Sequence, residues 1–185
     1  MAAPTSETGR LRTGRPTAPD GAVFRRAMGR FPTGVAIVTQ GCGPRTRAVT
    51  INSITSVSLE PTLLSLCLGQ DSSMLDSTLS ARHFTVNLLT AGQREQSVRC
   101  ADRNRPTGLA AQSYLGGQRG TNGSLVIDGA LAALECVLTT TVPAGDHVIL
   151  IGRVVALHQG PPDAEPLVFY GGSYRRLTAA EPPSA

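Results

Sequence analysis

The sequence predicts a mainly β protein, a closed or split antiparallel barrel with Greek-key-like connections and two or three short helices outside it. Six or more segments have the apolar runs or Val, Ile and Thr content of strands, and Gly- and Pro-rich turns separate them. Only a few short segments carry helix-start signals and a 3.6-residue apolar period. With 185 residues, 41% hydrophobic and 16% charged, the chain is long enough for one domain with a sizeable core.

The first segments predict a tail, a helix and a strand. Residues 1–20 are rich in Ala, Pro, Thr, Gly and Arg without periodicity, which predicts a disordered tail. Asp20 is placed to cap a helix over about 21–29. Its apolar face would be Val23, Phe24, Ala27 and Met28. Pro32 ends this helix, because proline disfavours helical geometry in the preceding residue, and a strand over Val35–Thr39 follows.

The stretch Arg47–Gly69 predicts two strands joined by the turn Leu59–Pro61. The first strand carries short polar side chains, namely Thr50, Asn52, Ser53, Thr55, Ser56 and Ser58. The second, Leu63–Leu68, is apolar except for Ser65, as expected of a strand covered on both faces. A strip of short polar side chains suits a flat heteroaromatic ligand, since its edge can be hydrogen-bonded while the ring lies close. A solvent-facing strand rich in Thr and Ser explains the same residues equally well.

A helix start follows the second of these strands. Asp71 or Ser72 would cap a helix whose apolar positions include Met74, Leu75 and Leu79. Free backbone N–H groups and the hydroxyls of Ser72 and Ser73 form a usable phosphate site there. Plain N-capping requires no ligand and remains the alternative.

The middle of the chain predicts another strand, another helix and a loop. His83–Leu89 is a strand in which Asn87 is the single polar residue of an apolar run, and a buried Asn needs hydrogen-bond partners. Thr90 caps a helix that continues to about Ala101. The polar, Gly- and Arg-rich segment 102–123 predicts a long surface loop, either functional or disordered.

The last third is predicted to be strongly β. Strands are expected over Ala130–Val142, His147–Gln159 and Leu167–Tyr170, the last continued through Gly171–Leu177. The start of the first could pass for a helix, but its Thr run favours a strand. Gly152, in the middle of the second, predicts a bulge or bend. Residues 178–185 are expected to be frayed.

Charge and cysteine content argue against several classes of function. All 17 cationic residues are Arg, the formal net charge is +4, and six of the Arg lie in the first 30 residues. No basic stripe is interleaved with aromatic residues, which disfavours nucleic-acid binding. The four cysteines form no CxxC pair and the three His are not spaced with them, so no metal site is expected. No signal peptide or long apolar run appears, so the expected location is cytoplasmic, without membrane contact.

The sequence offers few residues for acid–base or nucleophilic catalysis. It contains no recognisable Ser/His/Asp set, paired carboxylates, P-loop or Rossmann fingerprint. Hydride transfer between two bound planar cofactors has different requirements, because it needs overlap and distance control while the cofactors carry the chemistry. A protein with a ring-sized polar strip and few catalytic side chains meets those requirements.

Several segments together resemble one family. They are FPTGVAIVT (Phe31–Thr39), VTINSITSVSLEPTLLSLCL (Val49–Leu68), FTVNLL (Phe84–Leu89), GALAALEC (Gly129–Cys136), DHVILIGRV (Asp146–Val154) and PLVFYGGSYRRL (Pro166–Leu177). In this order, and over about residues 22–177, the chain resembles the short-chain NAD(P)H:flavin oxidoreductases. These are the flavin reductase components that supply reduced flavin to two-component flavin-dependent monooxygenases.

The resemblance implies an FMN-binding split barrel over residues 21–177, usually a homodimer with flavin sites near the subunit interface. It implies NADH-dependent reduction of free FAD or FMN, with FAD favoured, and transfer of reduced flavin to a partner monooxygenase. It places these residues at the flavin: Thr33, Thr50, Asn52, Ser53, Cys67, Leu68, Ser72, Ser73, Asn87 and Arg103. Relatives carry a Lys and a Phe where this chain has Asp102–Pro106, so Arg103 or Arg105 would replace that charge.

The resemblance also assigns the nicotinamide site to His147, Tyr170, Gly172 and Tyr174. His147 would position the nicotinamide and have no acid–base role, because hydride passes directly between the two rings. Taken without the resemblance, the pair Asp146–His147 is more typical of a hydrogen-bonded turn. Tyr174 is equally an aromatic residue at the core edge with its hydroxyl in water.

Two other functions remain open from the sequence. One is a non-catalytic flavin-binding or carrier protein on the same barrel, and the other is a pyridoxamine-phosphate-oxidase-like enzyme with tightly held FMN. NADH is favoured over NADPH because no compact Arg cluster lies beside the expected nicotinamide site to bind a 2′-phosphate.

Overall fold

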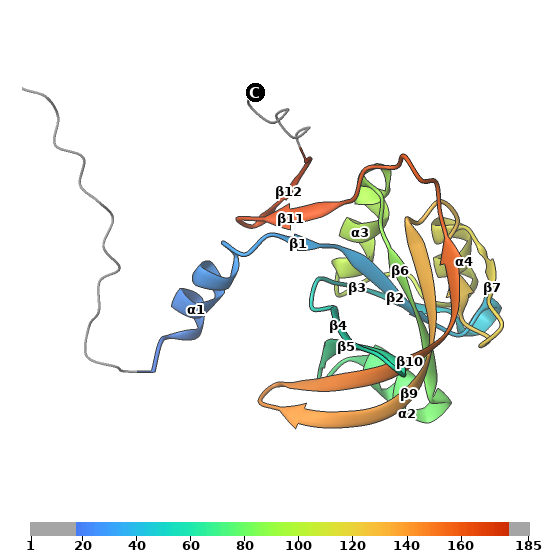
Figure 1. The fold of residues 1–185 in the computed structure, drawn as a ribbon, viewed down its shortest axis with the longest axis horizontal. Helices are drawn as coiled ribbons and strands as arrows, with labels where there is room; N and C mark the ends of the chain where they lie inside the picture. Colours follow the sequence, from blue (N-terminus) through green and yellow to red (C-terminus); the bar gives the residue numbers. More distant parts are fainter. Residues whose placement is uncertain (1–17, 178–185) are drawn as a thin grey trace, which may run out of the picture.

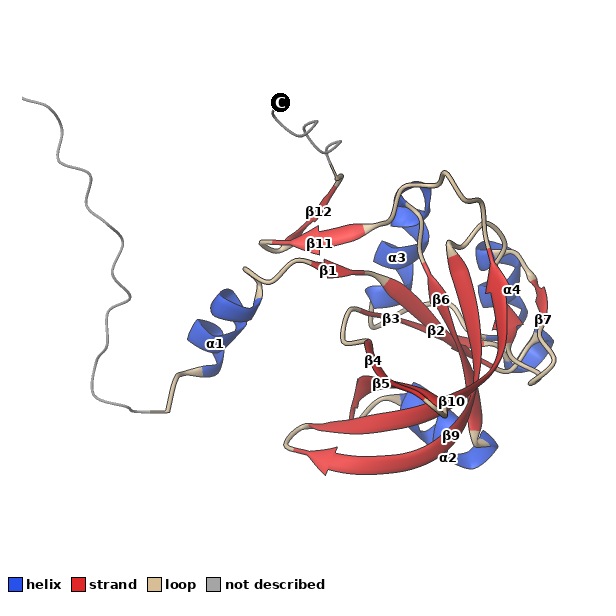
Figure 2. Ribbon diagram, viewed as in Figure 1, coloured by secondary structure: helices blue, strands red, loops and turns tan. Residues whose placement is uncertain are grey.

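The structure is a computed structural model that describes residues 18–177. The expected tail, apart from residues 18–20, and the expected frayed end at 178–185 lie outside the described residues. The described part is mainly β, as predicted, with short helices around the strands (Figures 1 and 2).

A seven-stranded antiparallel sheet forms the body of the molecule, in the order β3-β2-β6-β9-β10-β5-β4. Its strands are β2 (Ala36–Gln40), β3 (Arg47–Ile51), β4 (Thr55–Leu59), β5 (Thr62–Gly69), β6 (His83–Leu88), β9 (Ala132–Ala144) and β10 (His147–Gln159). The long strands β9 and β10 curve strongly and extend as a hairpin (Figure 2). Two small sheets complete the fold, made of β1 (Thr33–Gly34), β11 (Val168–Tyr170) and β12 (Ser173–Arg175), and of β7 (Gln118–Arg119) and β8 (Leu125–Val126).

Four α-helices accompany the strands within the described residues. They are α1 (Gly21–Met28), α2 (Ser73–Ala81), α3 (Arg94–Ala101) and α4 (Gly108–Leu115), with short 3₁₀ turns η1 (Gly43–Arg45) and η2 (Ala91–Gln93). Three predicted helix starts are confirmed, the third as the start of the 3₁₀ turn η2, which runs directly into α3. Asp20 accepts from the backbone of α1, Ser72 caps α2, and Thr90 forms a capping box with Gln93.

Two hydrophobic cores lie on the two sides of β2. Ala36 and Val38 point into a core closed by α2 and by β5, β6, β9 and β10. Ile37 points the other way, into a core that includes Cys100 of α3 and Leu115 of α4. Both sides of β2 are therefore buried, which explains its continuous apolar run.

Two predictions about the chain path are wrong. The segment Arg47–Leu59 is not one strand, because it turns at 52–54 and its halves β3 and β4 lie at opposite edges of the sheet. The segment 102–123 is not an irregular loop, because it contains α4 and β7. Ala111 and Leu115 of α4 are buried, so this helix is ordered by packing that its sequence signals only weakly.

The predicted irregularity at Gly152 is confirmed. The pairing of β10 with β9 shifts register between Ile151 and Gly152. A Cβ atom at Gly152 would lie 2.6 Å from the Phe84 ring, so the close approach of this core ring requires glycine.

No helix among residues 18–177 is long and apolar enough to span a membrane.

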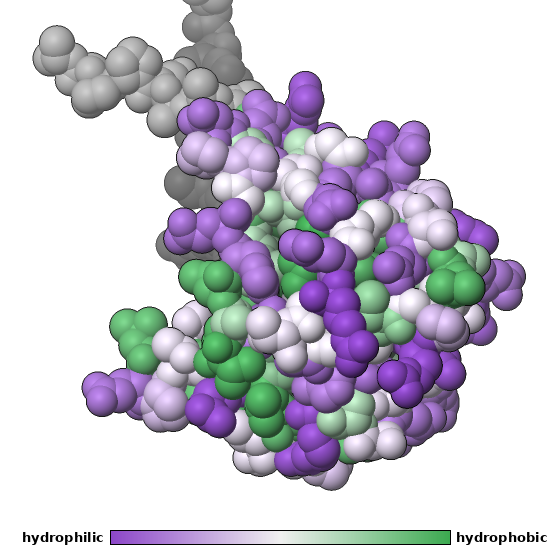
Figure 3. Space-filling model, turned by 90° about the vertical axis from the view of Figure 1, so that its right-hand side faces the viewer, coloured by the Kyte–Doolittle hydropathy of each residue, from purple (hydrophilic) through white to green (hydrophobic). Residues whose placement is uncertain are grey.

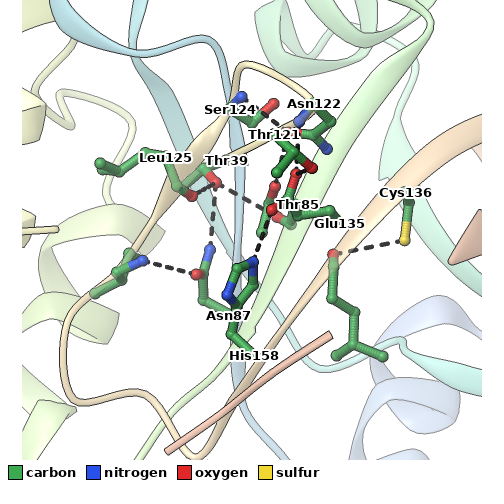
Figure 4. Close-up of polar contacts among 12 residues, drawn as sticks. Thr39, Thr85, Asn87, Thr121, Asn122, Ser124, Leu125, Glu135, Cys136 and His158 are labelled. Atoms are coloured by element: carbon green, nitrogen blue, oxygen red, sulfur yellow. Dashed lines mark hydrogen bonds and ion pairs between the residues drawn. The ribbon is translucent and has the colours of Figure 1, made fainter. Parts of the chain in front are cut away.

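A buried carboxylate ties the loop after β7 to the sheet (Figure 4). Glu135 of β9 is fully buried and accepts hydrogen bonds from the Thr121 hydroxyl at 2.8 Å and the Asn122 backbone N–H at 2.6 Å. His158 Nε2 lies 2.7 Å from its other oxygen. A Cβ atom at Gly120 would lie 2.8 Å from this carboxylate, so the loop approaches it closely only because that residue is glycine. β9, β10 and the loop after β7 are therefore joined at the Glu135 carboxylate.

Glu135→Ala is expected to lower the free energy of unfolding by about 3 kcal/mol, because it leaves the Asn122 N–H and the Thr121 hydroxyl without their charged acceptor. Urea unfolding measures this. Glu165→Ala is the control, since Glu165 is exposed and lies 3.6 Å from Arg176, an ion pair worth at most about 1 kcal/mol. Equal losses in the two variants would contradict the role of Glu135.

The stabilisation contributed by Glu135 is also expected to depend on pH. Burial by itself raises the pKa of Glu135, but the hydrogen bonds from His158, Asn122 and Thr121 outweigh it and lower the pKa below 4.5. The folded state therefore favours the ionised form. The stability difference between wild type and Glu135→Gln should be complete above about pH 4.5 and shrink as the pH falls below it.

Candidate functional site

Polar residues that follow β3 border two adjoining cavities. The larger cavity, about 640 Å³, lies between the end of α1, β1 and residues 52–55. The smaller one, about 220 Å³, lies between β3, the end of α3 and Tyr174. Asn52 and Phe169 line both, so we treat the two as one site and call it the Asn52 cleft.

The Asn52 cleft offers polar groups that the described residues leave unused. The Asn52 side chain is exposed, and no residue among 18–177 makes a hydrogen bond with it. The Thr33 hydroxyl is buried in the wall of the larger cavity and has no partner within the described chain. A buried polar group without a partner costs free energy. The exposed Asn52 amide can therefore hydrogen-bond a ligand edge, whereas the Thr33 hydroxyl lies buried in the wall and is left without a partner there.

A chain of hydrogen bonds fixes one wall of the cleft. The Thr50 hydroxyl donates to the Ser97 carbonyl at 2.7 Å, and the buried Ser97 hydroxyl lies 2.8 Å from the Tyr174 hydroxyl. The Tyr174 ring meets Phe169 edge-on at 5.3 Å, and the Arg94 guanidinium lies 5.5 Å from its centroid. Tyr174 is therefore held by packing and by its hydroxyl, which bonds to protein rather than standing free in water.

Ser53 fixes the floor of the cleft. Its hydroxyl accepts from the Cys67 backbone N–H at 3.1 Å and lies 3.3 Å from the Cys67 carbonyl oxygen. Leu68 is buried in the first core, so only its backbone can contribute to a site. The predicted residues Thr33, Thr50, Asn52, Ser53, Cys67 and Tyr174 are thus brought together.

A second group of predicted residues lies around the tip of the β9–β10 hairpin. Gln70 joins it to α2 through a backbone bond to Asp146 at 3.0 Å and a side-chain bond to Gly145 at 2.7 Å. Ser72 accepts from the Met74 N–H, so its hydroxyl already caps α2, whereas Ser73 is exposed.

His147 belongs to this second group. Its Nδ1 lies 2.7 Å from the Asp146 carboxylate, and both side chains are exposed. The hydrogen bond from His147 lowers the pKa of Asp146. The hydrogen-bonded turn that the sequence suggested is therefore present.

The predicted nicotinamide residues are not gathered in one place within a single chain. His147 begins β10 at the tip of one hairpin, whereas Tyr170 and Gly172 belong to the β11–β12 hairpin. Figure 1 shows these hairpins projecting from opposite ends of the left-hand side, with β4 between them.

Asn87 is corrected from a ligand contact to a structural residue. It is fully buried, its amide nitrogen bonds Ile37 and Thr39 at 3.1 and 3.2 Å, and its oxygen accepts from the Ile127 N–H at 2.9 Å (Figure 4). No polar group of the side chain remains for a ligand.

The two candidate arginines after α3 differ in whether their side chains are already hydrogen-bonded. Arg105 donates to the Asp102 carbonyl at 3.1 Å. Arg103 is exposed and makes no hydrogen bond or ion pair with residues 18–177. Within that range, Arg103 is therefore the free cation of the two.

Sequence reasoning missed Arg94, Ser97 and Phe169 as site residues. Phe169 lies inside a segment that was recognised, but its place between the two cavities depends on how β11 pairs with β1. Ser97 and Arg94 act through contacts with Tyr174, about 80 residues away, and no local pattern indicates them.

The site is suited to holding planar molecules rather than to acid–base work. Among residues 18–177 no three His, Cys, Asp or Glu side chains are grouped to hold a metal. Burial raises the pKa of Cys100 to about 11 and that of Cys136 to about 12, so both are protonated thiols at neutral pH. Short polar side chains and aromatic walls are what the cleft provides.

Comparison with known families gives a match over most of the chain. The sequence pattern of the family described as "Flavin reductase like domain" matches residues 28–178.

Individual relatives agree with this match. The NADH-dependent FMN reductase AsuE2 of Streptomyces nodosus subsp. asukaensis is 42% identical over 163 residues, which cover 88% of each chain. The NADH:FAD oxidoreductase SgcE6 of Streptomyces globisporus, solved with NAD and FAD fragments, has a TM-score of 0.80 at 35% identity, covering 89% of this chain and 98% of its own. BorF, the flavin reductase component of a bacterial two-component tryptophan halogenase, has a TM-score of 0.80 at 36% identity, covering 87% of this chain and all of its own.

Thr50→Val is expected to lower the free energy of unfolding by about 1–2 kcal/mol, because it keeps the side-chain shape but leaves the Ser97 carbonyl without its donor. Thr140→Val is the control, since Thr140 is exposed on β9 and its hydroxyl bonds nothing among residues 18–177. That change should stay within about 0.5 kcal/mol. Urea unfolding compares the two, and a smaller loss for Thr50→Val than for the control would refute the role of this hydrogen bond.

Proposed function

The chain belongs to the flavin reductase-like family, and on that premise we propose that it is an NADH-dependent flavin reductase. It reduces FAD or FMN and releases the reduced flavin to a partner flavin-dependent monooxygenase. The observation that carries this proposal is the Asn52 cleft, with the free Asn52 amide at its edge and the unpartnered Thr33 hydroxyl in its wall.

The residues present fit a flavin. The isoalloxazine edge carries carbonyl and imide groups that can hydrogen-bond the Asn52 amide. A Cβ atom at Gly34, which also lines the larger cavity, would meet nothing within 4 Å, so there is open space at this position of the wall. Ser53 and the backbone of Cys67 and Leu68 would support the ring. When bound, flavin supplies the acceptor for the hydride that NADH donates.

The chain itself contributes position and exclusion of water. The Thr50–Ser97–Tyr174 hydrogen bonds hold one wall in place, so this wall can position a bound ring. The aromatic rings of Phe169 and Tyr174 give that wall an apolar surface. Ser73 and the free backbone N–H groups at the start of α2 would meet the flavin phosphate, with Arg103 as a further cation.

We propose that the active form is a homodimer. The apolar face of α1 is exposed, with Val23 at 47%, Phe24 at 57% and Met28 at 52%, and the neighbouring Phe31 is 66% exposed. No residue of α1 is buried. An amphipathic helix with its apolar face in water is unusual in a stable monomer. A second copy covering this face would also bring a further hairpin toward the cleft, where His147, Tyr170, Gly172 and Tyr174 are proposed to hold the nicotinamide.

The same proposal includes the domain bounds, the barrel type, the cellular location and the flavin substrates. Residues 21–177 act as one domain, and the curved seven-stranded sheet forms a split barrel. The protein acts in the cytoplasm, which agrees with four cysteines that are all free. AsuE2 is named for FMN and SgcE6 for FAD, so relatives with either preference support both flavins as substrates.

The direct test is turnover. Purified protein is mixed with NADH or NADPH and catalytic FAD or FMN, and loss of the nicotinamide absorbance band gives the rate for each of the four pairs. NADH consumption that requires both flavin and protein is expected. Flavin binding without turnover in any pair would indicate a carrier instead.

His147→Ala is expected to raise the KM for NADH about tenfold, the effect of losing roughly one contact worth 1.4 kcal/mol, and to leave the KM for flavin within about twofold. Asn52→Ala is the matched control with the opposite pattern, since it removes a proposed flavin contact. Steady-state kinetics with one substrate varied at a time distinguish the two. Equal increases in both KM values for His147→Ala would reject its role at the nicotinamide.

A further inference from the structure

A separate basic cavity lies at the other end of β3. It has a volume of about 720 Å³ and is enclosed by the end of β2, η1, the start of β3, the second half of α2 and the loop after β7. Arg47 and Asn52 are five extended residues apart, about 16 Å along the chain. No residue that lines this cavity lines the Asn52 cleft. We call it the Arg119 groove.

Three arginines from three different segments border the groove. Arg45 comes from η1, Arg47 from β3 and Arg119 from β7. None of them forms an ion pair within residues 18–177. Asp76 is the one carboxylate in the lining, so with His83 neutral the lining carries a formal net charge of +2. Cations that converge on a concave surface and outnumber the anions there focus a positive potential.

The wall that carries Arg119 is built rigidly. The loop after it is tied down by Glu135, which takes bonds from Thr121 and Asn122, as described above. A Cβ atom at Gly123 (φ +86°) would lie 3.4 Å from Arg119 Nη2 and 3.8 Å from His83 Cε1, so the guanidinium and the imidazole lie against the same loop residue.

His83 is likewise fixed in place. Its Nδ1 lies 3.1 Å from the Ser124 hydroxyl. Burial, and then the charge of Arg119, lowers its pKa, so the ring is neutral at neutral pH. The positive charge of the groove therefore comes from the three arginines alone.

The groove continues past Arg119. A neighbouring cavity of about 580 Å³ shares Pro44, Arg45 and Arg119 with it and is also lined by Gln112. Arg45 and Arg119 thus border both spaces. This gives room for more than one anionic group in a row.

We propose that the Arg119 groove is a binding site for a small molecule with two or more linked phosphoryl groups, distinct from the Asn52 cleft. Guanidinium groups bind phosphate oxygens through paired hydrogen bonds. The hydroxyls of Ser77 and Ser80 also line the groove and add neutral partners for the remaining oxygens. The Asn122 side chain lines it as well, but its amide is already bonded to Phe84 and Ser124 and serves to shape the wall.

Shape and polarity select this class of ligand over others. The volume lies in the range of small-molecule pockets, about 300–1,000 Å³, whereas protein partners use broad, flatter surfaces. The lining holds no large apolar side chain to anchor a protein or an acyl chain. Figure 3 views the molecule from the side that carries β7, and hydrophilic residues (purple) cover much of that face.

The test is calorimetric titration of the full-length protein with pyrophosphate, ADP and orthophosphate at constant ionic strength. Pyrophosphate or ADP should bind at least tenfold more tightly than orthophosphate. Arg119→Gln and Arg47→Gln should each weaken the tighter ligand tenfold or more. Arg153→Gln is the matched control, since Arg153 is exposed on β10 outside the groove, and it should change affinity less than twofold.

Comparison of the pyrophosphate and ADP titrations shows which part of the ligand is recognised. Binding of pyrophosphate and ADP alike indicates recognition of the diphosphate alone, whereas binding of ADP only indicates an organic diphosphate. Binding that Arg119→Gln and Arg47→Gln leave unchanged, or that Arg153→Gln weakens equally, would overturn the proposal. So would loss of binding when FMN is present at saturation, because the groove would then be part of the flavin site. Circular dichroism and NADH:flavin turnover confirm that each variant is folded.

Discussion

The site depends on one serine hydroxyl that joins the two edges of the sheet. Ser53 lies where the chain leaves β3 and crosses to β4, and its bonds to the Cys67 backbone hold this crossing against β5. β3 and β4 are the outermost strands of the seven-stranded order, so the crossing brings opposite edges together. The preceding residue, Asn52, is thereby presented to the cleft instead of entering a strand ladder. The residues that would hold a flavin are consequently placed by backbone topology more than by packing.

The two ends of the molecule have different electrostatic character. The Asn52 cleft is lined mainly by amide, hydroxyl, aliphatic and aromatic groups, with Arg25 as its one charged lining residue, which suits rings that must stack at a set distance. The opposite end collects three arginines around a concave surface. A single strand, β3, connects both, beginning at Arg47 and ending just before Asn52. The Arg119 groove thus has more arginines in its lining than the cleft where hydride transfer is proposed.

Much of the fold was predictable because local signals and burial agreed. Asp20, Ser72 and Thr90 start helices, since each has a side-chain oxygen suited to capping and an apolar pattern after it. The irregularity at Gly152 was predictable because a glycine inside a long apolar strand commonly marks a bulge or a close approach of another group. By contrast, the break at 52–54 is set by a hydrogen bond to a residue fourteen positions away, and the polar run gave no sign of it.

The site was predictable in part, and the failures have a common cause. Asn52, Ser53 and Tyr174, which the family resemblance indicated, do lie close together, and their roles stay predictions. Asn87 was misassigned because a polar residue in a strand looks the same whether it binds a ligand or the backbone of its neighbours. Ser97 and Phe169 gain their roles only when distant segments pack. The basic groove was missed for the same reason, since its arginines are separated by up to 74 residues and form no cluster in the sequence.

The carboxylate of Glu135 also limits which segments can be exchanged independently in protein engineering. The loop after β7 is anchored to β9 directly and to β10 through His158, so these pieces form one structural module despite their separation in the sequence. Anyone who transplants residues 118–124 from a homologue should exchange positions 135 and 158 in the same step. A graft limited to the loop would leave a buried charge facing the wrong partners.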